Sequence, residues 1–143
     1  MILIDANIPL YAYDLGSARH AAAREWLERV LSSNEPIRFA IVTLLAYVRI
    51  ATNPAVYERP LDTVTAIGHV RSWLERPNVE IASPSDRHWA ILGDIASAGQ
   101  ARGPLVMDAH LAALAIEHGA TLMSTDRGLA RFRGLRVRDP LGG

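Results

Sequence analysis

The chain has 143 residues, of which 50% are hydrophobic and 21% are charged, and its formal net charge is zero. This length and composition fit one globular domain over residues 1–143 and argue against a disordered or collagen-like chain. Cysteine is absent, which excludes a disulfide scaffold, a cysteine-bound metal and thiol catalysis. No apolar run approaches the roughly 20 residues of a membrane span, and residues 1–5 lack the basic region of a signal peptide. We therefore expect a cytoplasmic protein with no membrane association.

Short apolar segments alternate with helical segments along the whole chain. In chain order we expect a strand at 1–4, a turn at 5–9, a helix at 17–30, a strand at 38–42, a buried helix at 43–51, a helix at 62–76, a strand at 79–82, a helix at 83–98, a loop at 99–104, a helix at 105–118, a strand at 120–124, a short helix at 126–132 and a strand at 135–137. This alternation predicts an α/β fold in which helices cover both faces of a parallel sheet.

Local signals indicate where several of these helices begin and end. We expect Ser17, Asp62 and Ser83 to act as N-caps, because their side-chain oxygens can accept a hydrogen bond from the first turn. Gly119 should end the 105–118 helix, since glycine readily adopts the left-handed conformation that terminates helices. The tryptophan and leucine stripes, Trp89 included, are expected in the core.

Three aspartates occupy corresponding positions in this pattern. Asp5 follows the first strand, Asp126 follows the fourth, and Asp108 lies in the first turn of the helix that leads into the fourth strand. Helices run opposite to strands in a parallel α/β sheet, so all three carboxylates should gather at its carboxyl edge, where such sheets bind ligands. Each aspartate alone could instead be a helix cap.

A cluster of carboxylates requires a counter-charge. Two carboxylates about 4 Å apart repel each other by roughly 4 kcal/mol at an effective dielectric constant near 20, more than capping offsets. Oxygen ligands favour Mg²⁺ or Mn²⁺. Such an ion suits phosphoryl chemistry, because it polarises a phosphate and lowers the pKa of an attacking water.

Three segments carry a family resemblance that spans essentially the whole chain. Residues 2–7 (ILIDAN) resemble the opening motif of PIN-domain ribonucleases. Residues 107–126, followed by Phe132 and Leu135, are similar to the second half of the VapC-type toxins in that family, and residues 48–54 (VRIATNP) resemble a segment found in many of them.

This resemblance implies a three-layer α/β/α sandwich around a central parallel sheet of about five strands. It also implies a Mg²⁺-dependent endoribonuclease toxin that cleaves RNA, with Mn²⁺ as the alternative ion. Toxins of this type are neutralised by a small antitoxin protein and commonly form homodimers. By position in the motifs, Asp5 and Asp108 would be the main metal ligands and Asp126 would complete the catalytic acidic cluster. Ser124 and Asn7 would support it.

One position departs from the family pattern. Many members carry a glutamate on the helix expected at 43–51, at about the place of Ala46, and no acidic residue occurs between Glu35 and Glu58. The acidic cluster then has three members rather than four. A second metal site is therefore in doubt, and a PIN-fold module that binds RNA or protein without cleaving it remains an alternative.

Other features leave further alternatives open. The C-terminal segment contains five arginines that either contact RNA phosphates or form a solvated basic face: Arg127, Arg131, Arg133, Arg136 and Arg138. Arg49 either reaches the site or packs its stem on the apolar helix. The histidines lack ligand spacing, and His110 is expected to be structural. A phosphatase with Asp5 as nucleophile usually has a second aspartate two residues later, where this chain has Asn7.

Overall fold

The computed structural model describes residues 1–142 and contains a five-stranded parallel sheet. Its strand order is β3-β2-β1-β4-β5. The strands are β1 Ile2–Ile4, β2 Ile37–Phe39, β3 Val79–Ile81, β4 Thr121–Met123 and β5 Val137–Arg138. Because β1 is central and pairs in parallel with β4, with Ile4 opposite Met123, the residues that follow these two strands emerge side by side.

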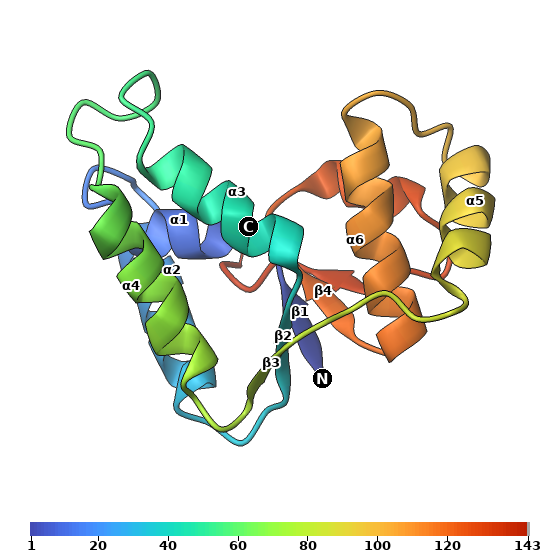
Figure 1. The fold of residues 1–143 in the computed structure, drawn as a ribbon, viewed down its shortest axis with the longest axis horizontal. Coiled ribbons are helices and arrows are strands. Elements are labelled where there is room, and N and C mark those ends of the chain that lie inside the picture. The colour runs from blue at the N-terminus through green and yellow to red at the C-terminus, as the bar shows by residue number, and fades with distance from the viewer. Residues whose placement is uncertain (143) are drawn as a thin grey trace.

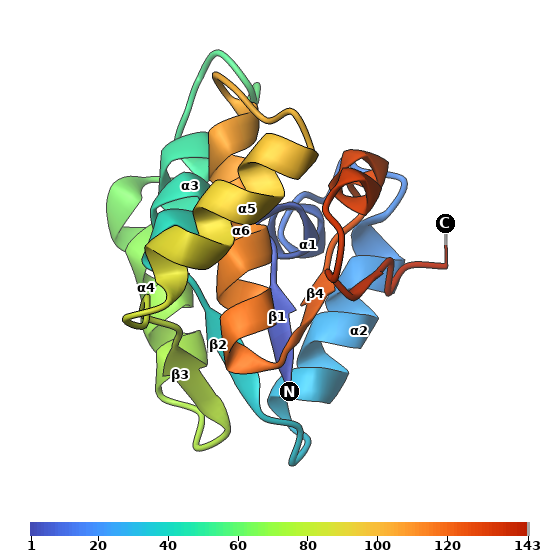
Figure 2. The ribbon, with the colours of Figure 1, turned by 90° about the vertical axis from the view of Figure 1, so that its right-hand side faces the viewer.

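Helices cover both faces of this sheet, as predicted (Figure 1). They are α1 Asn7–Ala12, α2 His20–Leu31, α3 Ile41–Ala51, α4 Thr63–Leu74, α5 His88–Ala98 and α6 Leu105–His118, with a short 3-10 helix, η1, at Arg127–Arg131. The first four helices lie on one side of the strands, and α5 and α6 lie on the other. Figure 2 looks from the α5–α6 side and shows β1 and β4 beside α6. The predicted three-layer α/β/α architecture is confirmed.

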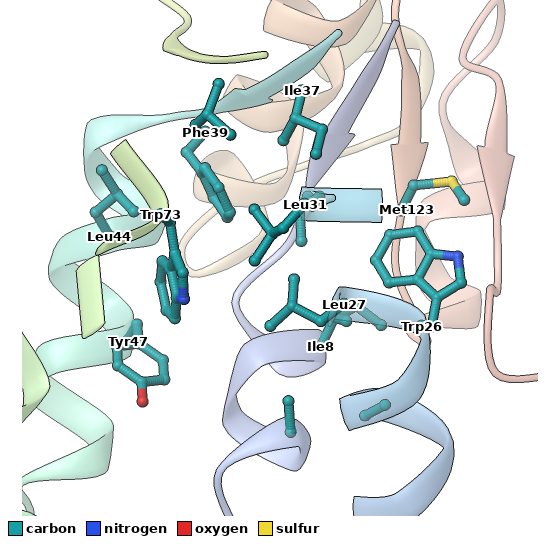
Figure 3. Packing of buried hydrophobic residues seen from close by; sticks show 14 of the residues in the cluster. Ile8, Trp26, Leu27, Leu31, Ile37, Phe39, Leu44, Tyr47, Trp73 and Met123 are labelled. Carbon is teal, nitrogen blue, oxygen red and sulfur yellow. The ribbon is translucent and has the colours of Figure 1, made fainter. Parts of the chain in front are cut away.

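The alternation of side chains along β1 divides the core into two clusters. Ile2 and Ile4 pack with α1 to α4, whereas Leu3 faces the opposite way and packs with α5 and α6. In the first cluster the rings of Phe39 and Trp73 stack with their centroids 5.4 Å apart (Figure 3). The sheet is therefore buried on both faces, as parallel sheets require.

Two predicted boundaries are wrong in the part of the chain that leads into the site. Helix α1 occupies the segment after the first strand where a turn is expected. Pro9 is compatible with this helix, because it lies in the first turn, where its nitrogen needs no intrahelical hydrogen-bond partner. The expected strand at 38–42 ends at Phe39, and α3 begins at Ile41 rather than at residue 43. The apolar run across residues 39–45 does not by itself distinguish a buried strand from a buried helix.

The cap predictions have mixed outcomes. Asp62 caps α4 by accepting a hydrogen bond from the Thr65 backbone at 2.7 Å, and Gly119 ends α6 in the left-handed conformation, with φ of +67°. The predicted caps Ser17 and Ser83 are wrong, because α2 begins at His20 and α5 at His88. Before α2, the Ser17 hydroxyl accepts from Arg19 N in a local turn, a bond that competes with helix formation.

The prediction that Trp89 belongs to the core is also wrong. Its side chain is 80% exposed, whereas Trp26 and Trp73 are buried. Helix α5 buries the face that carries His88, Leu92 and Ile95, and Trp89 lies about 100° around the helix from His88. No helix within residues 1–142 combines the length and the apolar character needed to cross a membrane.

Candidate functional site

Asp5 is fixed at the carboxyl edge of the sheet by the pairing of β1 with β4. The ladder continues one residue past β1, since Asp5 N donates to Met123 O at 3.0 Å. This places Asp5 beside Ser124, whose hydroxyl donates to Asp5 Oδ2 at 2.7 Å. The other carboxylate oxygen accepts from Ala6 N at 2.8 Å. Both oxygens of Asp5 are therefore oriented by neighbouring donors.

Asn7 and Asp126 complete this network around the Ser124 hydroxyl. Asn7 Nδ2 donates to Ser124 Oγ at 3.0 Å and weakly to Asp5 Oδ2 at 3.4 Å. Asp126 N also donates to Ser124 Oγ, at 3.0 Å. Ser124 thus links the ends of β1 and β4, and the structure brings four of the sequence-predicted residues into one hydrogen-bonded group. Because Asn7 carries an amide that donates here, it does not supply the second carboxylate expected of an aspartate-nucleophile phosphatase.

The carboxylates influence one another electrostatically. Burial raises the pKa of Asp5, the hydrogen bonds from Ser124 and Ala6 lower it, and the charge of Asp126 raises it. Burial also raises the pKa of Asp108, as do the charges of Asp126 and Asp5, while Arg131 lowers it. The charge of Asp126 thus acts on both Asp5 and Asp108, and the gathering of the three aspartates into one site stays a prediction.

Asp5 and Asp108 share a pocket of about 380 Å³. Its walls come from the end of β1, the three turns of α3 and the first two turns of α6. The lining residues are Asp5, Ala6, Val42, Thr43, Leu45, Ala46, Arg49, Met107, Asp108 and Leu111. Asp126 is exposed and lies outside these walls. Its Oδ1 caps η1 by accepting a hydrogen bond from Gly128 N at 2.8 Å. Asp126 is therefore a helix cap, the alternative role considered for each aspartate, and this does not exclude a role in catalysis.

The donor set is suited to a hard cation, although it is not arranged around a single point. Asp5 and Asp108 supply carboxylate oxygens, the ligands that Mg²⁺ and Mn²⁺ prefer. Burial is the main cause of the raised pKa of each carboxyl group, and the charge of Asp126 raises both pKa values further. Within residues 1–142, no three aspartate, glutamate or histidine side chains are placed so that they could hold one metal ion together. The shared ligand set of Asp5, Asp108 and Asp126 therefore remains a prediction.

The predicted RNA-contacting arginines take different positions. Arg49 is exposed and lines the pocket. Arg131 acts on the pKa of Asp108, and its guanidinium donates to the carbonyl oxygens of Gly128 and Gly99 at 3.3 and 3.5 Å. Arg127 and Arg133 are exposed beside it in sequence.

Two features of this region escaped the sequence analysis. Thr43 is 3% exposed and lines the pocket, and its Oγ1 lacks a hydrogen-bond partner within residues 1–142. On the far side of α6, His110 Nδ1 lies 2.9 Å from His88 Nε2, and His88 Nδ1 lies 2.9 Å from Glu117 Oε2. This chain of side chains joins α5 to α6 and agrees with the structural role expected for His110. Neither feature has a sequence signal, because each depends on which residues the fold brings together.

Comparison with known proteins agrees with this architecture. The family model described as "PIN domain" matches residues 2–135. The chain is 41% identical to Ribonuclease VapC37 of Mycobacterium tuberculosis over 140 residues, which cover 98% of this chain and 97% of that protein. It is 38% identical to VapC ribonuclease Mb2897 of Mycobacterium bovis, covering 100% of this chain and 97% of that protein.

Solved structures show the same fold at lower sequence identity. VapBC2 from Rickettsia felis, bound to a DNA fragment from its promoter, matches with a TM-score of 0.70 at 19% identity, over 96% of this chain and 98% of that one. Mycobacterium tuberculosis VapC20, described as a sarcin–ricin loop cleaving toxin, matches with a TM-score of 0.65 at 16% identity, over 95% and 99% of the two chains. The chain therefore belongs to the PIN-domain family, and the full-length relatives that it matches are VapC ribonucleases.

Proposed function

We propose that this protein is a VapC-type endoribonuclease toxin that hydrolyses RNA phosphodiester bonds with the help of a bound Mg²⁺ or Mn²⁺ ion. The observation that carries the proposal is the pairing of Asp5 with Asp108 on one pocket, with Asp5 held by Ser124 at 2.7 Å. The identity with ribonucleases over nearly the full chain supports RNA as the substrate.

Each residue of the site has a role in this proposal. Asp5 and Asp108 would hold the ion, which would polarise the scissile phosphate and lower the pKa of the attacking water. Asp126, which lies outside the pocket walls, accepts the proton of that water directly or through a second water. The water oxygen then bonds to phosphorus as one phosphorus–oxygen ester bond breaks, and the leaving oxygen takes up a proton. Ser124 and Asn7 keep the Asp5 carboxylate in position for this step.

Arginines beside the pocket would bind the RNA backbone. Arg49 lines the pocket, and Arg131 lies close enough to Asp108 to affect its pKa. Arg127 and Arg133 extend this basic surface along the chain. Phosphate contacts of this kind add affinity that falls with rising salt and do not select a sequence.

An antitoxin protein would mask the site. Structural neighbours include VapBC complexes from Rickettsia felis and Salmonella typhimurium. In this chain Leu45 is 63% exposed and Met107 is 50% exposed, and both line the pocket beside the two aspartates. Exposed apolar side chains beside a charged pocket are suited to a protein partner that covers both. We further propose a cytoplasmic location and a homodimer, the latter testable by light scattering.

A cleavage assay tests the proposed activity. Purified protein is incubated with structured RNA in the presence of Mg²⁺ or of a chelator, next to Asp5→Asn and Asp108→Asn. Cleavage that requires the metal and is lost in both variants supports the proposal. Equal cleavage by the variants would identify a contaminating nuclease instead.

Ala46 favours a second candidate, a PIN-fold module that binds without cleaving. The pocket wall carries the methyl group of Ala46 where the family resemblance leads us to expect a carboxylate. Metal binding measured by calorimetry together with intact RNA in the assay would favour this alternative.

A further inference from the structure

The pocket has a second wall that is not acidic. Helix α3 begins there, after β2, with Ala40 extended at its N-cap and no side chain capping the first turn. The first N–H groups of a helix have no intrahelical partner, and together with the helix dipole they attract anions. An uncapped N-terminus at a pocket wall is therefore able to receive a negatively charged group.

Thr43 provides an independent sign that this wall binds a ligand. It lies in the first turn of α3 and lines the pocket, yet its hydroxyl is buried and has no partner within residues 1–142. A buried hydroxyl without a partner is destabilising, so such a group calls for an explanation. Threonine has two favourable χ1 rotamers in a helix, so the hydroxyl can be presented to a ligand oxygen while the backbone stays in place.

The neighbours of Thr43 on α3 complete a site for an anion. Ala46 lines the same wall with a methyl group, which leaves room and brings no negative charge. Arg49, one turn further along the helix, lines the pocket with an exposed guanidinium. Asp5 and Asp108 face this donor wall from the other elements of the pocket. A ligand that fits this pocket must present negatively charged oxygens to the donors of α3. It must also be able to share a cation with the carboxylates of Asp5 and Asp108. A phosphodiester meets both requirements.

We propose that the Thr43 hydroxyl and the start of α3 form a subsite that holds an RNA phosphate next to Asp5 and Asp108, with Arg49 at its rim. The identity of the ligand as RNA rests on the proposed function. The small side chain of Ala46 leaves space for this phosphate at the pocket wall. Thr43 is thus a substrate-binding residue of the pocket.

Two substitutions at one position test the subsite. Thr43→Val has nearly the same shape and removes the hydroxyl, whereas Thr43→Ser keeps it. We expect Thr43→Val to lower kcat/KM for RNA by about tenfold to hundredfold, the effect of losing a hydrogen bond to a charged group. Its melting temperature should stay equal or rise, because an unpartnered hydroxyl is removed. Thr43→Ser should retain most of the activity.

Thr52→Val is the matched control on the same helix. The Thr52 hydroxyl donates to Val48 O at 2.7 Å at the end of α3, away from the pocket. This control should leave kcat/KM unchanged. Wild-type kcat/KM in Thr43→Val would overturn the subsite, and so would a fall in melting temperature that accompanies the loss of activity in both Thr43 variants.

A binding experiment separates failure of the subsite from failure of the proposed activity. Inorganic phosphate is titrated into the wild type and Thr43→Val in buffer with Mg²⁺ and followed by NMR. Phosphate binding that weakens about tenfold in Thr43→Val supports the subsite even if the wild type does not cleave RNA. Equal binding by the two proteins, or no binding by either, would overturn it. RNA cleavage abolished by Asp5→Asn would, in each case, still establish the activity.

Discussion

Ser124→Ala should weaken both the fold and the proposed site, because one hydroxyl makes three hydrogen bonds. The side chain is 2% exposed, donates to Asp5 Oδ2 at 2.7 Å, and accepts from Asn7 Nδ2 and Asp126 N at 3.0 Å each. A bond to a charged group contributes about 1.5–3 kcal/mol and a neutral one about 0.5–1.5 kcal/mol. Because water can restore part of this at the pocket, we expect a loss of about 2–4 kcal/mol, or roughly 5–15 °C in melting temperature.

The same substitution should change the pH dependence. The Ser124 hydrogen bond lowers the pKa of Asp5 against the effect of burial, so its removal raises that pKa further above the usual value of 3.8. An acid with a raised pKa in the folded state costs stability once it ionises. The deficit of Ser124→Ala should therefore be smallest below the unfolded pKa and grow as pH rises through the folded pKa. The acidic limb of the cleavage rate should move to higher pH.

Urea denaturation at several pH values and a pH–rate profile measure these effects. Ser72→Ala is the control, since its exposed hydroxyl donates only to His69 O on the surface of α4; its stability should stay within about 0.5 kcal/mol of the wild type. The reasoning would be refuted if Ser124→Ala matched that control in stability and kept the wild-type acidic limb.

Three further predictions concern charge, burial and backbone strain. Asp108→Asn should abolish cleavage and yet melt at a higher temperature than the wild type at neutral pH. Burial and the neighbouring carboxylates raise the pKa of Asp108, so its charged form costs stability in the folded state. A lower melting temperature than that of the wild type would contradict this prediction. His88→Ala should cost about 2–4 kcal/mol in urea denaturation, because the side chain of Glu117 is fully buried and loses its contact with the His88 ring. A loss of stability below about 1 kcal/mol would count against this prediction. Gln100→Gly should raise stability by about 1 kcal/mol in calorimetry, since Gln100 has φ of +54°, and no gain would show that this backbone is unstrained.

The position of the site could be predicted from the sequence because it follows from the order of the elements. Asp5 comes directly after a buried strand and Asp126 shortly after another, and the parallel pairing of β1 with β4 brings their ends together. Asp108 lies in the first turn of α6, the helix that leads into β4, and this end of the helix lies at the same edge of the sheet. The motifs around these residues carried the family resemblance as well, and the match to the PIN-domain model over residues 2–135 bears it out.

What the sequence could not predict depends on contacts between distant residues. Nothing near Thr43 indicates that its hydroxyl will be buried without a partner. The chain from His110 through His88 to Glu117 joins residues that are 22 and 29 positions apart and has no periodic signature. Helix α1 is not evident from the sequence, because a proline shortly after Asp5 and Asn7 is typical of a turn, although Pro9 also fits the first turn of a helix.

The most direct test of the account is a titration of Mn²⁺ into the metal-free protein, followed by electron paramagnetic resonance or calorimetry. The central claim is that the acidic edge of the sheet binds a divalent cation through Asp5 and Asp108. Saturable Mn²⁺ binding that weakens at least about tenfold in both Asp5→Asn and Asp108→Asn is the predicted result. Binding of equal strength in the wild type and both variants, or its absence from the wild type, would contradict the claim.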